Sequence, residues 1–214
     1  MLLGGEAEML GLPSTTEVDK RIPKEAFYRN LKMSAALRAS FTDDIDRIVV
    51  RNSIKSSTTN VPPGERVAEI MVLEVSLKRR QVPAEALRAI AAQNPHKLLF
   101  ACTYQGECAL AVLLKSLVVG EWQPLQGAGI SLRAESIDAV WDSMASQIAY
   151  DDEGSESQTV EQRFANDAKL VAMKEELAKL EARRKKEKQF ARKNAMFEKA
   201  KKLKARIAAF EEGR

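Results

Sequence analysis

The sequence predicts an α+β fold, in which a small mixed sheet packed with helices is followed by a long, basic, coiled-coil-like C-terminal helix. Three observations predict it. Residues 9–149 alternate between helical spacing of apolar residues and short β-branched runs. Residues 151–158 are acidic and small, and residues 160–212 contain neither Gly nor Pro. We therefore expect a disordered extension over 1–8, a head domain over 9–149, an acidic linker over 150–159 and a helix over 160–214.

Two helices are expected at the start of the head. Pro23 stands where the first turn of a helix tolerates proline. A second helix should begin near Ser34, because apolar residues then recur at helical spacings of four, four and three, at Leu37, Phe41, Ile45 and Ile48. The β-branched run 48–50 is expected as the first strand, and Pro62, Pro63 and Gly64 close the loop that follows.

The middle of the head should supply the sheet. Residues 67–78 are apolar on both faces of a strand, which predicts a central position. A helix should run from Pro83 to Asn94, where Pro95 stops it. The apolar runs 97–104 and 107–114 flank Gln105-Gly106 and predict a hairpin. A last amphipathic helix over 137–148 should close the head.

The tail carries two apolar seams with the spacing of a coiled coil. The first is formed by Leu170, Met173, Leu177 and Leu180, and the second by Met196, Ala200, Leu203, Ile207 and Phe210. The interval from Leu180 to Met196 is not a whole number of heptads, so the seams are out of phase. Either a helix of roughly 80 Å pairs with two surfaces, or it bends in the middle.

Charge is divided unevenly between the two parts. Residues 160–214 hold 17 Lys or Arg against 9 Asp or Glu, whereas residues 1–159 hold 17 against 21. From Arg183 to Arg206 there are 12 cations and two acids. Such a run predicts an anionic partner, and phosphate is the leading candidate, although a solvated helix that docks its apolar seams on a protein would carry similar charge.

Other features exclude some classes of protein. No stretch has the length of apolar sequence that a membrane span needs, and Glu6 and Glu8 stand where a signal peptide is basic or apolar, so we expect a cytoplasmic protein. Cys102 and Cys108 are expected to be reduced thiols. Neither a metal-ligand cluster nor a phosphate-binding Gly-rich loop is present in the sequence, so we expect no cofactor and no metal.

The segment from Met9 to Lys24, MLGLPSTTEVDKRIPK, resembles the opening of the bacterial proteins catalogued as domain of unknown function family 4391. Later fragments occur in the order of the family and extend the resemblance over about 9–149: Thr59-Asn60-Val61, Glu69-Ile70, Leu98-Leu99-Phe100, Glu121-Trp122 and Leu132 to Ile148. Members are commonly encoded beside a helicase and a DNA methyltransferase of the restriction-modification kind. The resemblance therefore implies an accessory part in antiviral defence.

A metal-dependent nuclease is the enzymatic alternative. Its acids would come from Asp43, Asp44, Asp46, Glu69 and Glu74, with Lys78 near the phosphate. The strand lacks a Lys two residues after Glu74, so we instead expect Glu74 and Lys78 to form an ion pair at a strand edge. His96 is the only histidine, which leaves it without a second imidazole for a metal site.

We accordingly expect a non-catalytic accessory subunit that docks on a helicase or methyltransferase, with a stand-alone nucleic-acid-binding protein as the alternative. The expected nucleic-acid contacts are Arg183, Arg184, Lys185, Lys186, Lys188, Arg192 and Lys193. The expected partner contacts are Lys20, Arg21, Lys24, Leu203, Ile207 and Phe210, and self-association through the tail is left open.

Overall fold

A computed structural model describes residues 10–30, 33–132, 135–155 and 157–212, so the extension expected over 1–8 lies outside the described residues. The chain divides into two compact units, residues 1–160 and 161–214. We call the first unit the head and the second the hairpin, and describe each by itself.

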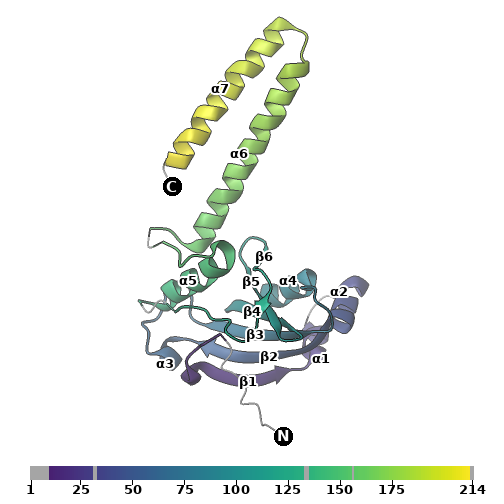
Figure 1. Cartoon of the computed structure of the whole chain (residues 1–214), viewed down its shortest axis with the longest axis vertical. Helices are drawn as coiled ribbons and strands as arrows, with labels where there is room; N and C mark the ends of the chain where they lie inside the picture. The colour runs from purple at the N-terminus through teal and green to yellow at the C-terminus, as the bar shows by residue number, and fades with distance from the viewer. Residues whose placement is uncertain (1–9, 31–32, 133–134, 156, 213–214) are drawn as a thin grey trace. The chain divides into compact units, whose positions relative to one another are not determined.

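Seven strands of the described head form one mixed sheet in the order β1-β2-β3-β4-β5-β6, with β7 also paired to β5 (Figure 1). Among the pairs of described strands, only β3–β4 is parallel, and α4 is the crossover between these two strands. The strands are β1 Glu17–Ile22, β2 Ile45–Ile54, β3 Ile70–Leu77, β4 Lys97–Tyr104, β5 Glu107–Leu113, β6 Leu117–Val119 and β7 Gln123–Pro124.

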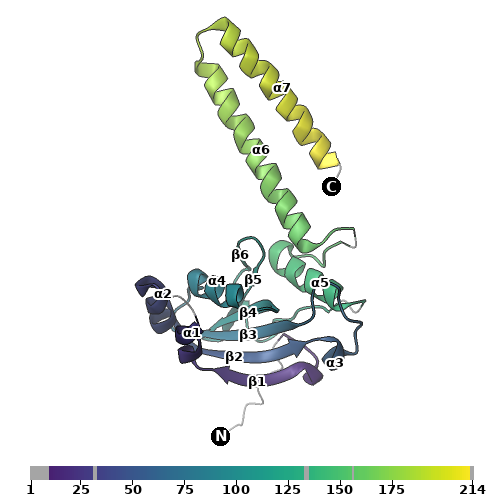
Figure 2. The same ribbon diagram turned by 180° about the vertical axis from the view of Figure 1, so that it is seen from behind.

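The helices of the head are short except for the last one (Figure 2). They are α1 Lys24–Asn30, α2 Ala35–Ala39, α3 Ser56–Thr59, α4 Ala84–Gln93 and α5 Ile137–Tyr150, with a 3-10 turn at Ser14–Thr16 and a π turn at Ser40–Asp44. Ser136 caps α5, because its hydroxyl accepts a hydrogen bond from the Ala139 amide at 3.2 Å. The expected α+β class and central position of β3 are confirmed.

The head has a hydrophobic core on each face of the sheet. Along β3, Ile70 and Val72 belong to one core, whereas Leu73 and Val75 belong to the other. The first core is covered by α5, whose Trp141 is fully buried. The second is covered by α4 and by Phe41. This alternation explains why both faces of β3 are apolar in sequence.

The expectation of one helix through Ile45 and Ile48 is wrong. The helix ends in the π turn, and Ile45 begins β2. A register shift between Ile45 and Arg47 marks a bulge, which places Ile45 and Ile48 in the same core although they are three residues apart in a strand. The bulge therefore gave the buried residues of a strand the three-residue spacing that is typical of a helix.

Strand β1 was not expected, because its sequence Glu-Val-Asp-Lys-Arg-Ile has no apolar alternation. Five of its six residues are exposed at the edge of the sheet. The strand exists through its pairing with β2, which includes Arg21 opposite Val49 and Ile22 opposite Ile48. A polar edge strand with a bulge and a positive φ at Asp19 resists further edge-to-edge pairing.

The C-terminal segment is two helices and not one. Helix α6 spans Val160–Lys186, α7 spans Phe190–Glu212, and the chain reverses between them at residues 187–189 (Figure 1). The two out-of-phase seams explain the break, because reversing the chain lets each seam cover the other. Leu170 and Met173 of α6 share a core with Ile207 of α7.

Candidate nucleic-acid interface

The hairpin is held together by a narrow apolar core with ion pairs beside it. Its buried residues are Leu170, Met173 and Ile207, and Leu177, Leu203 and Phe210 pack around them. Lys174 and Glu211 form an ion pair of 2.7 Å, and Lys204 and Glu181 form a second of 2.7 Å. The hydrogen bond from Lys204 lowers the pKa of the Glu181 carboxyl below its usual value. This core is small, and most of the side chains of α6 and α7 lie on the surface, where a ligand can reach them.

The reversal is made by a short polar turn. The Glu187 amide donates to the carbonyl oxygens of Arg183 and Arg184, which ends α6. The Glu187 carboxylate then accepts a hydrogen bond from the Gln189 amide at 2.8 Å. Lys193 donates its amide to the Gln189 carbonyl at 2.9 Å, so α7 starts at once. The C-terminal end of α6 and the N-terminal end of α7 are therefore separated by only three residues.

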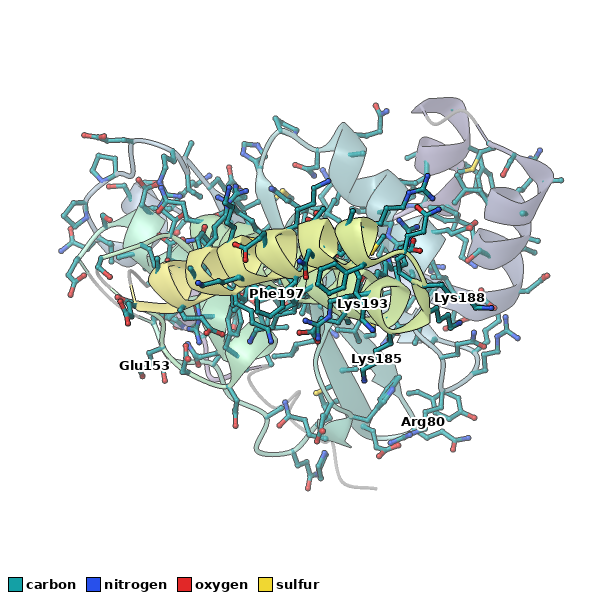
Figure 3. The ribbon with its side chains drawn as sticks, turned by 90° about the horizontal axis from the view of Figure 1, so that it is seen from above. Arg80, Glu153, Lys185, Lys188, Lys193 and Phe197 are labelled. Carbon is teal, nitrogen blue, oxygen red and sulfur yellow. The ribbon has the colours of Figure 1, made fainter. Side chains whose placement is uncertain are left out.

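This turn brings together all seven cations that the sequence assigned to nucleic acid. Arg183, Arg184, Lys185 and Lys186 form the last turn of α6, Lys188 lies in the connection, and Arg192 and Lys193 lie in the first turn of α7. Figure 3 shows Lys185, Lys188 and Lys193 around the hairpin. We call these seven residues the tip cluster.

The two halves of the tip cluster differ in their relation to the helix dipoles. Cations in the last turn of α6 lie at the negative end of its dipole, which stabilises that helix. The first turn of α7 contains no acid, and its cations lie at the positive end, which costs about 0.3–1 kcal/mol per charge. A bound anion would offset that cost, so this placement favours a role in binding over a role in stability.

A groove between the two helices combines Arg183 of the tip cluster with four cations that were not among the seven expected contacts. It has a volume of about 510 Å³ and is lined by Lys179 and Arg183 of α6 and by Lys199, Lys202 and Arg206 of α7, with Glu176 as the one acid. We call these five cations the groove cations. The spacing of Lys199, Lys202 and Arg206 by three and four is a helical stripe that could have identified them. Lys179 could be placed only once the chain reversal was known.

The expected partner contacts on the tail already have contacts within the chain. Leu203, Ile207 and Phe210 pack in the hairpin core, and Ile207 is 7% exposed. Lys169 lies over the Phe210 ring at 4.8 Å. Their burial thus has an intramolecular explanation, and their contact with a partner stays a prediction.

The expected partner contacts on the head lie at the start of the sheet. Arg21 and Lys24 line a hollow of about 450 Å³ together with Glu25, Asp46 and Arg47, whereas Lys20 is exposed on β1. The Lys24 ammonium donates to the Ile45 carbonyl. Burial lowers the pKa of Lys24, and the nearby charge of Lys78 lowers it further. The charges in this hollow are mixed, so it is a weaker anion site than the hairpin.

The expected ion pair between Glu74 and Lys78 is wrong. Glu74 is 4% exposed in the centre of the sheet, and its Oε2 lies 2.6 Å from Arg51 Nε and from Arg51 Nη2. Its Oε1 accepts from Ser76 and Thr103. Lys78 instead donates to the Thr42 carbonyl at 2.7 Å. The error arose because pairing across strands, invisible in sequence, brings Arg51 of β2 next to β3.

Arg51 also bridges to the edge strand, since its Nη1 lies 2.8 Å from an Asp19 oxygen. Burial by itself lowers the pKa of Arg51, but the hydrogen bonds to Asp19 and Glu74 outweigh that effect and raise it. Glu74 thus has the partners of a structural ion pair.

The remaining nuclease candidates do not converge. Asp44 pairs with Arg79, and Glu69 accepts from Ser53 at 2.6 Å and lies 3.7 Å from His96. Within the part of the chain that the structure describes, no three His, Cys, Asp or Glu residues come close enough to hold a metal ion. Asp44, Glu69 and Glu74 therefore make separate contacts with different partners.

The cysteines lie on opposite faces of the sheet, Cys102 in the core under α4 and Cys108 in the core under α5. Both are free thiols, as expected. Burial raises the pKa of Cys102 to about 12. Among the described helices, none is both long and apolar enough to cross a membrane.

These features define a class of protein, an α+β head joined to a cationic helical hairpin. A family model described as Domain of unknown function (DUF4391) matches residues 10–207, and the chain belongs to this family. No curated protein and no solved structure matches it. The resemblance expected over 9–149 is extended by this match, which includes α6 and most of α7. The hairpin is therefore part of the family's domain.

Proposed function

We propose that this chain is a non-catalytic accessory subunit of a restriction-modification-like antiviral defence complex, and that its hairpin contacts DNA. The head docks on a helicase or a DNA methyltransferase. The hairpin holds the phosphate backbone through the tip cluster and the groove cations. The observation that carries the proposal is the convergence of cations from α6 and α7 at one turn and in one groove.

Chemistry supports phosphate as the ligand. Lys and Arg side chains that extend from a rigid pair of helices can contact phosphates without reading bases, so the binding is independent of sequence and falls steeply with salt. The packed hairpin core fixes the backbone from which these side chains project. The defence context rests on the neighbouring genes that the resemblance to this family implies.

The salt dependence of DNA binding tests the phosphate contact. A variant with Arg183, Lys199 and Lys202 changed to Gln keeps helix propensity and removes three charges from the two helices. We expect weaker binding, and a slope of log affinity against log salt that is smaller by up to about 2.7 units. The matched control changes Arg29, Arg88 and Lys115, three exposed cations of the head, to Gln. Equal losses in the two variants would contradict a specific role for the hairpin.

A capture experiment separates the accessory subunit from a stand-alone DNA-binding protein. We expect the full chain to retain a helicase or methyltransferase from lysate of its own host, and to bind DNA alone only at low salt. Tight binding by the purified chain at physiological salt, with no such partner retained, would favour the stand-alone protein.

A further inference from the structure

Two aromatic rings are exposed among the cations of the hairpin. Phe190, the first residue of α7, is 78% exposed, and Phe197 is 47% exposed. Helix packing does not account for them, because the buried residues of α7 are Ala200 and Ile207. Phe190 buries little of its ring and Phe197 about half, and rings exposed to this extent on a strongly charged surface are informative exceptions.

The two rings lie on one flank of α7. They are seven residues apart, which is close to two helical turns, and Lys193 lies between them on that flank. Figure 3 shows Lys193 and Phe197 on the same side of α7. Arg184 of α6 lies over the Phe197 ring, with 5.3 Å from its guanidinium carbon to the ring centroid. The flank therefore alternates rings with cations.

This alternation matches unpaired nucleic acid better than a duplex. Bases in a duplex are stacked on each other and offer no free face to a ring on a helix, whereas unpaired bases stack readily on aromatic side chains while cations hold the phosphates. The rise between Phe190 and Phe197 is about 10.5 Å, or roughly three times the base spacing of a stacked strand. Each ring can thus receive a separate base of a strand that runs along α7.

We propose that Phe190 and Phe197 stack on bases of single-stranded DNA, and that the tip cluster, which includes Arg184 and Lys193, binds its phosphates. This inference rests on the proposed function and specifies its ligand as an unpaired segment. Such a segment is what a strand-separating partner would expose.

The test compares the affinity of the full chain for a single-stranded DNA 20-mer and for the duplex of the same sequence. We expect the single strand to bind more tightly. Changing both Phe190 and Phe197 to Leu keeps apolar surface but removes the rings, and should weaken single-strand binding about 10-fold with little effect on the duplex. Changing both to Trp should retain the preference. Val171→Ala, which trims an apolar residue of α6 that is 55% exposed, should change neither affinity.

The outcomes separate this inference from the proposed function. Equal affinity for both forms, unchanged in the Leu variant, would overturn the stacking proposal and leave the phosphate contact standing. Binding to neither form at low salt would overturn both. Tighter binding to RNA of the same sequence would overturn the assignment to DNA. Loss of binding to anionic phospholipid vesicles in the Leu variant, with DNA binding intact, would instead assign the rings to a membrane surface. Circular dichroism of each variant serves as the control, and we expect it to be unchanged because neither substitution alters a buried residue of the hairpin.

Discussion

At the residue scale, Gly64 is the glycine, among those described, at which an added Cβ would have least room. The loop 64–67 wraps around the Asp138 carboxylate at the start of α5, which accepts hydrogen bonds from the amides of Glu65, Arg66 and Val67. A Cβ on Gly64 would lie 2.2 Å from an Asp138 oxygen and 2.7 Å from the Val67 carbonyl oxygen. The glycine is therefore required for the loop to reach α5.

Gly64→Ala should lower the free energy of unfolding by about 1–3 kcal/mol, because either the loop or Asp138 must move. Thermal unfolding measures the change. Gly129→Ala is the control, since a Cβ there meets no atom within 4 Å and the backbone φ is not positive. Equal stability of the two variants would show that the loop adjusts freely.

Glu74 is the second residue for which the structure makes a quantitative expectation. Glu74→Ala leaves Arg51 without its buried partner and should cost about 3–5 kcal/mol. A double variant, Glu74→Leu with Arg51→Met, should recover part of that loss, because the buried carboxylate and the guanidinium that faces it are removed together and the Asp19 carboxylate that also loses Arg51 is half-exposed. Urea unfolding of the single and double variants tests this. Divalent-dependent DNA cleavage that Glu74→Ala abolishes would contradict a structural role and support the nuclease.

At the element scale, the hairpin depends on the contact between α6 and α7. A helix with few buried residues is marginal by itself, so each helix needs the apolar seam of the other. The seam is narrow, because the buried apolar residues of the hairpin, among those described, are Leu170, Met173, Ala200 and Ile207. Its loss should therefore unfold the hairpin and scatter the cations.

Changing Leu203 and Ile207 to Ser should reduce helical content in far-ultraviolet circular dichroism, because loss of a buried Leu or Ile typically costs about 2–5 kcal/mol. DNA affinity should fall with helicity, although no charge is changed. Val171→Ser, at an exposed position of α6, is the control. Unchanged helicity combined with loss of a captured partner would mean that this seam serves the partner.

At the scale of the whole molecule, the chain combines two units with different charge. The head carries a net acidic balance and both sheet cores, whereas the hairpin carries the excess of cations. The segment between α5 and α6 is exposed at Asp151, Asp152 and Glu153, and Val160 at its end is buried. This arrangement lets each unit fold around its own core.

Limited proteolysis with an enzyme that cuts after acidic residues should cleave first within 151–159, because the segment has exposed acids and few apolar anchors. The product expected is a folded head that retains a cooperative thermal transition. Mass spectrometry locates the cut. Persistent resistance of the segment, with cleavage first inside α6, would contradict the expected linker.

Several elements could be predicted from sequence because local chemistry determines them. Helix α4 ends before Asn94-Pro95, and the turn at Gln105-Gly106 has positive φ at both residues, as a two-residue hairpin requires. Strand β3 has apolar residues on both faces, which required a central position. The location of the cationic run was visible as well, since charge is a property of composition.

Tertiary structure alone decided the remaining features. The bulge in β2 made Ile45 and Ile48 appear helical, and β1 is a strand only through its pairing with β2. Glu74 pairs with Arg51, and Lys179 lines the same groove as Lys202. In each case the two residues are 23 positions apart in the sequence. Sequence alone determined that this protein has an α+β head and a basic helical tail, because periodicity, turn residues and charge act locally. Chain reversal and strand pairing decided which of those charges meet, because such contacts depend on packing between distant segments.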